Sequence, residues 1–269
     1  MINGAVLGSP ITHSLSPTLH KAAFDFLGID GNYKALEVPE FTFASFFESR
    51  SRDFDYFSIT MPLKEEVLEA GFEIDEHTAR IQSANCLYKR GGNWHLTSTD
   101  GSGLIAALEH AGHTSFDRAL VLGAGGTARA VVGALDSCTN HLTVLGRSDT
   151  RREALEGAIR NSEFEYRRWT PDVDLADYDL VVNTTPAGAA DLLADNVRNR
   201  ECKVLFDVIY KPWPTVLASR WADAGGVVIN GLELLLYQGI DQLELALDRE
   251  LDRLGLATAL RAVLKKAAK

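Results

Sequence analysis

Cysteine is scarce in this chain of 269 residues, which contains only three. Cys86, Cys138 and Cys202 lie far apart and form no CxxC or HxxC pair. A disulfide framework usually has an even number of cysteines, and a zinc site has closely spaced ligands, so neither is expected. The seven histidines show no ligand spacing either. We therefore predict a protein without a metal site, whose cysteines stay reduced as they do in the cytoplasm.

An excess of positive charge is also absent. The chain has 27 basic and 37 acidic residues, and its formal net charge is −10. Nucleic acids and anionic membranes are bound through positive fields, so we expect neither as a partner. An anionic small molecule would have to be bound by local basic groups.

Long apolar runs are lacking as well. Charged residues interrupt even GLELLLYQGIDQLELAL (231–247), whereas a membrane-spanning helix needs about 20 apolar residues. The N-terminal MINGAVLGSPIT has no basic leader and no long apolar stretch, so a signal peptide is not expected. Hydrophobic residues still make up 46% of the chain, an ordinary value for a globular protein of the cytoplasm.

Short strand-like and helix-like patterns alternate over the first hundred residues. Such alternation predicts an α/β architecture with mostly parallel strands. A hairpin is expected around the glycines at 91 and 92. The expected strands are 4–8, 32–38 and 54–60, and the expected helices are 17–28, 41–50 and about 64–70.

A second α/β unit begins near Asp117. Its pattern predicts a six-stranded, doubly wound sheet. The chain after about Leu232 is helical in pattern and could return to the first unit. Five of the six strands are expected within 118–122, 141–147, 177–186, 203–210 and 225–231, and helices are expected within 126–135, 151–160 and 215–225.

A glycine-rich turn connects the first strand and the first helix of this second unit. Gly123, Gly125 and Gly126 stand directly between them in VLGAGGTARA. Glycines allow a tight turn there, and the helix N-terminus offers N–H groups to a pyrophosphate. The spacing differs from strict GxGxxG, and a purely structural turn is the alternative. We predict a dinucleotide site.

Basic residues follow the second strand of this unit. Enzymes that use NAD usually have an acid there, which binds the ribose 2′-hydroxyl. This chain has Arg147 and Ser148, followed by Arg151 and Arg152. A guanidinium can bind a 2′-phosphate through two parallel hydrogen bonds. The pattern favours NADP over NAD, although a solvated helix could carry the same arginines in its first turn.

Lys64 and Asp100 are candidates for acid–base chemistry. Lys64 follows a largely apolar strand in SITMPLK, and Asp100 lies in STDGSG, where glycines permit a close approach. Reduction of a carbonyl requires a proton donor, and a lysine held by an aspartate can provide one. An ordinary salt bridge between the two is the alternative.

Several neutral polar residues are candidates for binding a substrate. Ser14 and Ser16 lie in one loop, where both can donate to a carboxylate. Ser16 could instead cap the helix that Pro17 is expected to start. Single neutral donors or acceptors are also available at Thr60, Asn85, Tyr210 and Gln238.

Taken together, the motifs resemble those of the shikimate dehydrogenase family over nearly the whole chain. SITMPLK is similar to the family's Asn-Val-Thr-x-Pro-x-Lys, and STDGSG to its Asn-Thr-Asp-x-x-Gly. The order of the eight motifs is more specific than any one of them. They are GSPITHSLSP, SITMPLK, SANCLY, STDGSG, GAGGTARA, GRSDTR, NTTPAG and NGLELLLYQ.

The resemblance implies reversible, NADPH-dependent reduction of 3-dehydroshikimate to shikimate, a step in the biosynthesis of chorismate and the aromatic amino acids. It implies that Lys64 and Asp100 are the catalytic pair. The implied substrate-binding residues are Ser14, Ser16, Thr60, Asn85, Tyr210 and Gln238. The implied cofactor-binding residues are Gly123, Ala124, Gly125, Gly126, Thr127, Arg147, Ser148, Arg151, Val208 and Gly231.

The resemblance also implies a domain order. Residues 1–101 would form a substrate-binding domain, 102–237 a Rossmann NADP-binding domain, and 238–269 helices that pack back on the first domain. The protein would be a monomer or a homodimer. A relative that uses quinate or aminoshikimate, or an NADP-binding regulatory module without turnover, is the alternative.

Four positions depart from the family motifs. Ser58, Ser98 and Gly146 stand where the family has asparagine, and Leu234 stands where methionine is frequent. None of them alters Lys64 or Asp100. Each lost buried hydrogen bond would cost about 0.5–1.5 kcal/mol, so substrate preference and affinity are open.

Overall fold

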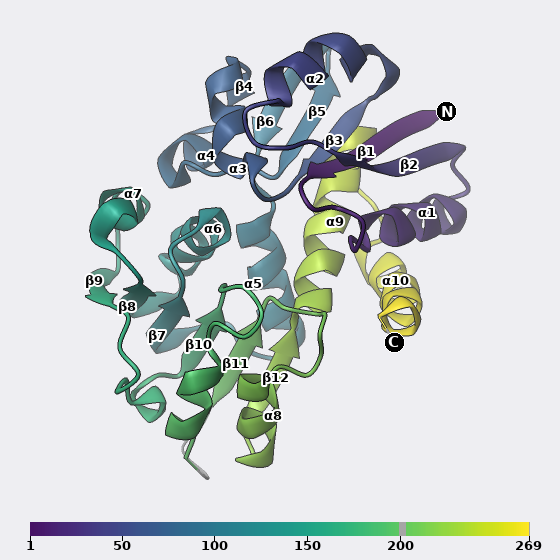
Figure 1. Cartoon of the computed structure of the whole chain (residues 1–269). Helices are drawn as coiled ribbons and strands as arrows, with labels where there is room; N and C mark the ends of the chain where they lie inside the picture. Colours follow the sequence, from purple (N-terminus) through teal and green to yellow (C-terminus); the bar gives the residue numbers. More distant parts are fainter. Residues whose placement is uncertain (199–202, 269) are drawn as a thin grey trace. The chain divides into compact units, whose positions relative to one another are not determined.

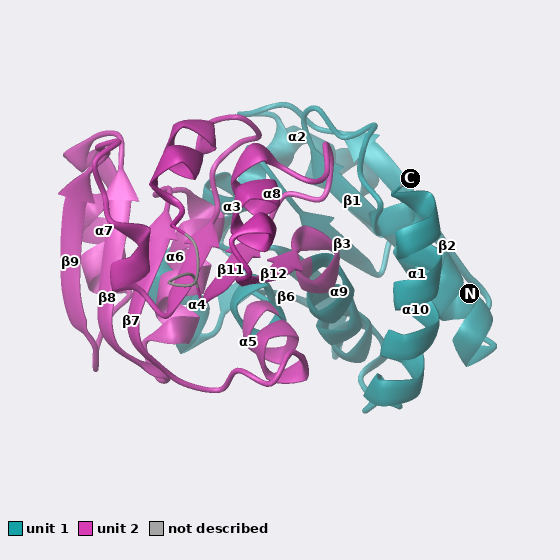
Figure 2. Cartoon of the chain, turned by 90° about the horizontal axis from the view of Figure 1, so that it is seen from below, with its two compact units in different colours: residues 1–103, 235–269 teal, residues 104–234 magenta. Residues whose placement is uncertain are grey.

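The computed structural model describes residues 1–198 and 203–268 (Figure 1). The chain divides into two compact units (Figure 2), namely unit 1, Met1–Gly103 with Leu235–Lys269, and unit 2, Leu104–Leu234. Cys86 and Cys138 are free thiols, and Cys202 lies outside the described residues.

Unit 1 contains a six-stranded mixed sheet with strand order β2-β1-β3-β5-β6-β4. β1 pairs in parallel with β2 and β3, and β5 pairs antiparallel with β3 and β6. β5 and β6 form the hairpin that the sequence predicted around Gly91 and Gly92, and both glycines have positive φ. The strands are β1 Ile2–Gly8, β2 Gly31–Glu37, β3 Tyr56–Ile59, β4 Glu73–Ile74, β5 Cys86–Arg90 and β6 Asn93–Thr97.

Helices cover both faces of this sheet. On one face, Ala5, Leu7, Phe57 and Ile59 pack with Leu63 and other apolar residues in a buried cluster. On the other face α1 and α10 lie side by side (Figures 1 and 2). The helices are α1 Ser16–Leu27, α2 Phe43–Arg50, α3 Leu63–Glu66, α4 Glu76–Ile81, α9 Gly231–Leu247 and α10 Arg253–Ala267, and α9 begins in unit 2.

Local signals explain how several of these elements end. Gly28 adopts the left-handed conformation after α1, with φ of 63°, as expected for a helix C-cap. The helix predicted over about 64–70 is an α-helix only to Glu66 and continues as a 3₁₀-helix over Val67–Ala70. Gly71, with φ of 77°, ends it.

Unit 2 contains a six-stranded parallel sheet with strand order β12-β11-β10-β7-β8-β9, the doubly wound order that the sequence predicted. Its strands are β7 Phe116–Leu122, β8 Thr139–Gly146, β9 Glu163–Arg168, β10 Leu180–Asn183, β11 Val204–Asp207 and β12 Val227–Asn230. Its helices are α6 Gly126–Leu135, α7 Arg152–Gly157 and α8 Val216–Asp223, together with α5 Asp100–His110, which begins in unit 1.

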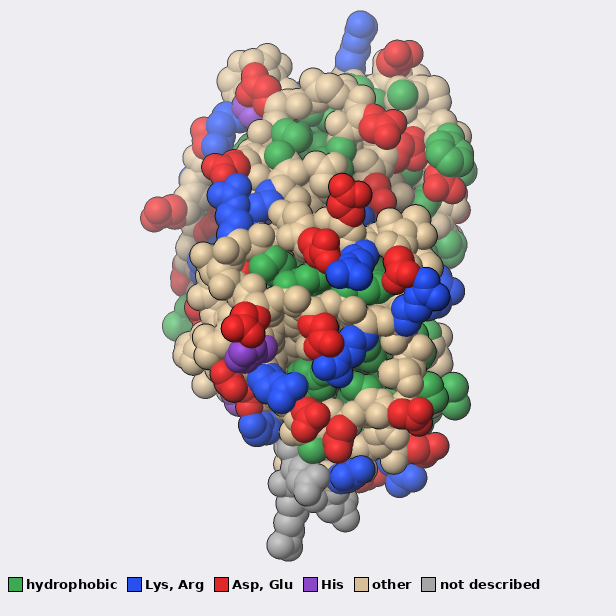
Figure 3. All heavy atoms as spheres, turned by 90° about the vertical axis from the view of Figure 1, so that its left-hand side faces the viewer, with side chains coloured by type: hydrophobic (Ala, Val, Ile, Leu, Met, Phe, Trp, Pro, Cys, Tyr) green, Lys and Arg blue, Asp and Glu red, His purple; other side chains and the backbone are tan. Residues whose placement is uncertain are grey.

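Charged side chains of both signs are interspersed on the face drawn in Figure 3. Within the described ranges, none of the helices is both long enough and apolar enough to cross a bilayer.

Candidate functional site

Lys64 and Asp100 form an ion pair in unit 1. Lys64 is the second residue of α3, directly after the loop that follows β3, and Asp100 is the first residue of α5. The Nζ of Lys64 donates to Oδ2 of Asp100, and their side chains are only 15% and 7% exposed. The pair therefore lies at the protein surface but is largely screened from solvent by its neighbours.

Two side-chain amides adjoin this pair. Asn85 Nδ2 donates to Oδ1 of Asp100 at 2.7 Å and to Oε1 of Gln238 at 3.2 Å. Asn85 Oδ1 accepts from the main-chain N of Thr99 at 2.6 Å. Both oxygens of Asp100 thus have donors, Asn85 on one and Lys64 on the other, so the carboxylate has a fixed orientation.

Gly103 allows α9 to approach α5 closely. A Cβ at this position would lie 2.7 Å from the main-chain N of Gln238, closer than atoms can pack. The absence of a side chain therefore brings Gln238 within reach of Asn85. This agrees with the close approach predicted from the glycines in STDGSG.

The loops with Ser14, Ser16 and Thr60 leave the same edge of the unit 1 sheet. β1 and β3 are parallel neighbours, and their loops are joined by a hydrogen bond from Ser9 N to Met61 O at 3.0 Å. Ser14 Oγ accepts from Ser16 N at 3.3 Å. Leu15 occupies the N-cap of α1 without a side-chain cap, so the alternative in which Ser16 caps this helix is wrong.

A titratable residue is buried beneath this edge. His20 on α1 is fully buried, stacks on Tyr33 with ring centroids 3.9 Å apart, and shares a 2.7 Å hydrogen bond between Nδ1 and the hydroxyl of Tyr56. Its Nε2 has no partner among the residues that the structure describes. Burial lowers the pKa of His20 from 6.5 to about 3, so the folded protein holds the imidazole neutral.

We expect His20 to make the protein sensitive to acid. Below about pH 6.5 His20 binds a proton in the unfolded chain but not in the folded chain. The free energy of unfolding therefore falls as the pH falls toward 3. Between pH 6.5 and about pH 5 the loss is about 2 kcal/mol. Urea unfolding over this range should show a shallower pH slope for His20→Asn than for wild type. An unchanged slope in His20→Asn would contradict the assignment.

The glycine turn in unit 2 has the form that a dinucleotide requires. Gly123, with φ of 106°, follows β7, and a Cβ there would lie 2.6 Å from Oγ1 of Thr184. Ala124 follows, Gly125 is the N-cap of α6 without a side-chain cap, and α6 starts with Gly126 and Thr127. The first turn of a helix points its N–H groups outward, where they can bind phosphate oxygens.

The arginine segment leaves the neighbouring strand at the same edge. Arg147 directly follows β8, the parallel neighbour of β7, and both Arg147 and Ser148 are exposed. Nη1 of Arg151 lies 3.4 Å from the position that a Cβ on Gly125 would occupy. Arg151 therefore spans from this segment to the glycine turn, whereas Arg152 is paired with Glu156 at 2.7 Å. These residues fit a phosphorylated ribose beside a pyrophosphate.

Tyr166 accounts for the glycine at position 146. A Cβ on Gly146 would lie 2.0 Å from the hydroxyl oxygen of Tyr166, which donates to the main-chain O of Ser148 at 2.5 Å. The aromatic side chain thus leaves no room for a side chain at position 146 and, through Ser148, supports the segment that carries Arg147.

We expect Gly146→Ala to displace Tyr166 and to weaken NADP binding. Loss of the Tyr166–Ser148 hydrogen bond, worth about 0.5–1.5 kcal/mol, corresponds to a rise in Kd of about two- to tenfold. Calorimetric titration of wild type and Gly146→Ala with NADP measures this change in Kd. Gly157→Ala is the matched control, because a Cβ there meets nothing within 4 Å. Equal Kd values for all three proteins would show that Tyr166 does not support the segment.

The other predicted residues of unit 2 follow β11 and β12. Gly231 packs on Val208, because a Cβ on Gly231 would lie 2.0 Å from the carbonyl oxygen of Val208. Tyr210 is half-buried in the segment after β11. This segment is held by Asp207, whose carboxylate accepts from Asn183 Nδ2 and from Ile209 N, both at 3.1 Å.

Three residues with clear structural roles around these sites were missed by the sequence analysis. They are Tyr33 and Gln242, which belong to the hydrogen-bond network behind Asn85, and Asp207. Gln242 lies one helical turn after Gln238, and this i,i+4 spacing was the available signal. The burial of Asp207 raises its pKa.

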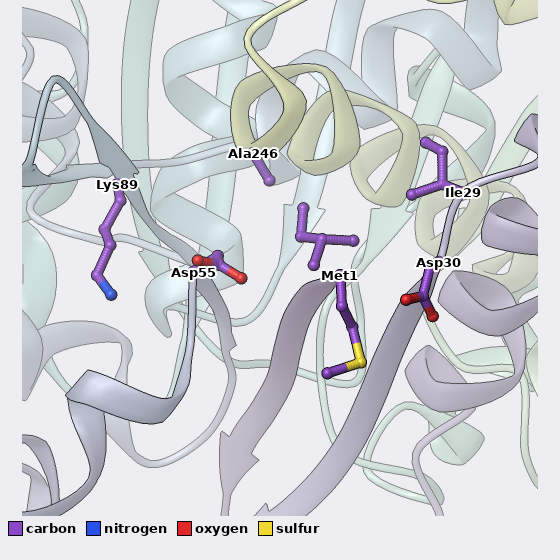
Figure 4. A pocket seen from close by; sticks show the side chains of 7 residues that line it. Met1, Ile29, Asp30, Asp55, Lys89 and Ala246 are labelled. Carbon is purple, nitrogen blue, oxygen red and sulfur yellow. The ribbon is translucent and has the colours of Figure 1, made fainter.

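Two surface hollows lie away from these residues. One, of about 410 Å³, is at the amino end of β1, lined by Met1, Asp30, Asp55 and Lys89 among others (Figure 4). Lys89 already donates to Phe54 O at 2.5 Å. The other, of about 790 Å³, surrounds the amino ends of β7, β8 and β9. Lys64 and the glycine turn follow the carboxyl ends of parallel strands, so neither hollow is their site.

No group of three or more His, Cys, Asp or Glu side chains suited to a metal ion occurs within residues 1–198 and 203–268.

Known proteins resemble the chain over almost its full length. A family model described as the shikimate dehydrogenase substrate binding domain matches residues 6–87. The chain is 31% identical over 268 residues to the shikimate dehydrogenase (NADP(+)) of Staphylococcus aureus, with 97% of this chain and 98% of that protein covered.

Solved structures agree with this. The crystal structure of Mycobacterium tuberculosis shikimate dehydrogenase has a TM-score of 0.85 and 33% identity, covering 97% of this chain and 100% of that one. Shikimate 5-dehydrogenase from Thermus thermophilus, in complex with NADP(H) and shikimate, has a TM-score of 0.83 and 30% identity, covering 98% and 100%. The chain therefore belongs to the shikimate dehydrogenase family.

Proposed function

We propose that the protein is an NADP-dependent shikimate dehydrogenase, which reduces 3-dehydroshikimate to shikimate and catalyses the reverse reaction, in aromatic amino-acid biosynthesis. The observation that carries the proposal is the Lys64–Asp100 ion pair with Asn85 and Gln238 around it. The 31% identity to a shikimate dehydrogenase (NADP(+)) over 97% of the chain supports it.

Lys64 is the proposed proton donor and acceptor. Its ammonium group gives a proton to the oxygen of the substrate carbonyl during reduction and takes it back during oxidation. Asp100 holds the Lys64 Nζ in place, and its own orientation is fixed by Asn85. The low exposure of both side chains limits competition from water, which strengthens this hydrogen bond.

The substrate is proposed to bind through neutral groups and two serines. Ser14 and Ser16 bind its carboxylate, which fixes the distance of the reacting carbon from Lys64. Thr60, Asn85, Tyr210 and Gln238 are proposed to bind the ring hydroxyls. The proposed substrate domain is 1–101 with the helices of 238–269, and the proposed cofactor domain is 102–237.

The cofactor site is proposed at the carboxyl edge of the unit 2 sheet. NADPH, when bound, supplies the hydride for the carbonyl carbon. Gly123, Ala124, Gly125, Gly126 and Thr127 offer main-chain groups to the pyrophosphate. Arg147, Ser148 and Arg151 bind the 2′-phosphate, and Val208 and Gly231 shape the surface for the nicotinamide. The enzyme is proposed to act as a monomer or homodimer in the cytoplasm, without a nucleic-acid or membrane partner.

Absorbance of reduced nicotinamide tests this function. Purified protein is offered shikimate or quinate, each with NADP or NAD, in four separate assays. A dominant signal with shikimate and NADP is the expected result. A dominant signal with quinate would transfer the assignment to a quinate-using relative. If folded protein that binds NADP gave no absorbance change in any of the four assays, a regulatory module would be favoured.

A further inference from the structure

A buried chain of amides lies behind the Lys64–Asp100 pair. Gln242, one turn after Gln238 on α9, is fully buried. Its Nε2 donates to Oε1 of Gln238 at 2.7 Å and to the main-chain O of Asn85 at 3.2 Å. Gln242 therefore holds both amide residues that adjoin the ion pair.

Hydroxyl groups fix the other end of this side chain. Oε1 of Gln242 accepts from Oγ of Ser58, and the same Oγ is bonded to the hydroxyl of Tyr33. A hydroxyl has one hydrogen, so with Ser58 donating to Gln242, Tyr33 must donate to Ser58. Burial raises the pKa of Tyr33, which keeps this donor protonated.

Only one orientation of the Gln242 amide satisfies all of these groups. Rotation by half a turn would place its oxygen against Oε1 of Gln238 and the main-chain O of Asn85, which are both acceptors. Two buried hydrogen bonds would then be lost, and like partial charges would face each other. Ser58 therefore selects the orientation in which Gln242 donates toward the site.

The sheet is built to bring Tyr33 to Ser58. Tyr33 on β2 and Tyr56 on β3 both pair with Gly4 on the intervening strand β1. A Cβ on Gly4 would lie 2.6 Å from Cδ2 of Tyr33. Because Gly4 has no side chain, the Tyr33 ring crosses β1 and its hydroxyl reaches Ser58, two residues after Tyr56.

We infer that Ser58 and Gln242 are positioning residues for the substrate amides, with Tyr33 as their support. The inference rests on the proposed function. Gln242 holds Oε1 of Gln238, and Nε2 of Gln238 donates one hydrogen to the main-chain O of Leu235 at 3.0 Å, which leaves its second hydrogen for a substrate hydroxyl. Loss of either residue leaves Oε1 of Gln238 with only the 3.2 Å hydrogen bond from Asn85 and removes the donor to the main-chain O of Asn85. Both amides are then held less firmly, so the effect falls on the substrate and not on the cofactor.

Gln242→Met and Ser58→Ala test this role. The first keeps the side-chain length but removes the amide, and the second removes only the hydroxyl. Each is expected to raise the KM for shikimate by about tenfold, with the Kd of NADP unchanged. The double variant should be no worse than the more impaired single variant, because the two residues act in one chain. Leu243→Met, at the next fully buried position of α9, is the control for packing.

Steady-state kinetics, calorimetric titration with NADP and thermal melting are measured for all variants. The inference is supported if Leu243→Met melts at a lower temperature but keeps the wild-type KM for shikimate, while Gln242→Met and Ser58→Ala have a raised KM. A wild-type KM in both test variants, or fully multiplicative effects in the double variant, would overturn it. If Gln242→Met does not fold, Ser58→Ala and Tyr33→Phe decide the question.

A readout without turnover separates this inference from the proposed function. Wild-type protein that does not oxidise shikimate counts against the proposed function alone. The side-chain N–H resonances of Asn85 and Gln238 then test the network. They should shift in Gln242→Met and Ser58→Ala and stay in place in Leu243→Met, and unchanged resonances in both test variants would reject the positioning role.

Discussion

Replacement of Lys64 with alanine is expected to lower kcat for shikimate oxidation by about 10²- to 10⁴-fold, the range that general acid–base catalysis contributes. The reason is the position of the Lys64 side chain, which is 15% exposed and whose ammonium group is held by a carboxylate with its second oxygen bound by Asn85. Steady-state kinetics at saturating NADP measures the loss. The Kd of NADP should not change, since the proposed cofactor residues belong to unit 2.

Two further variants separate proton transfer from charge. Lys64→Arg keeps a positive charge beside Asp100 but cannot release a proton at neutral pH, so it should be nearly as impaired as Lys64→Ala. Lys34→Ala, at an exposed lysine of β2, should retain wild-type activity. If Lys64→Ala lost less than about tenfold in kcat, the assignment of Lys64 as the proton donor would have to be abandoned.

The sequence predicted the elements around the site because local chemistry marks their ends. Pro62 and Lys64 follow β3, Gly123 follows β7, and Arg147 follows β8. Within each sheet the carboxyl ends of parallel strands gather at one edge, so a motif that follows a strand indicates the functional edge of its own unit. The glycines of STDGSG and the resemblance predicted that Lys64 pairs with Asp100, and the two side chains form an ion pair.

Elements without a buried apolar run could not be predicted in the same way. β9 has the sequence EFEYRR, and four of its residues are exposed, so its alternation is weak. β4 has only two residues, Glu73 and Ile74, both exposed. Hydrogen bonds to neighbouring strands define these edge strands, and such bonds leave no periodic pattern of their own.

Contacts between distant residues account for the departures from the family motifs. Ser58 and Gly146 each suggested a lost contact, but Ser58 donates to Gln242, 184 positions away, and Tyr166 lies where a Cβ on Gly146 would be. No local pattern shows which face of a late helix will meet an early strand. Ser98 differs from both, because its Oγ is buried without a partner among the described residues.

Replacement of Arg147 with alanine is expected to raise the Kd of NADP by about 10- to 100-fold and to leave the Kd of NAD nearly unchanged. A hydrogen bond to a charged group is worth about 1.5–3 kcal/mol, and only NADP carries the 2′-phosphate. Arg147 directly follows β8, where enzymes specific for NAD carry an acid. Calorimetric titration with each nucleotide at one ionic strength gives the two constants.

Arg152→Ala is the matched control for this variant. Arg152 lies in the same exposed segment and carries the same charge, but it is paired with Glu156 at 2.7 Å. Loss of Arg152 should raise the Kd of NADP only slightly. The remaining effect comes from the lower local positive charge, whose field salt screens within about 10 Å. Because Arg147→Ala and Arg152→Ala remove the same charge, a large effect confined to Arg147 must come from direct contact with the 2′-phosphate. If Arg147→Ala instead weakened the binding of NAD and NADP equally, Arg147 would support the fold of the segment. The discrimination between NADP and NAD would then have to come from Ser148 or Arg151.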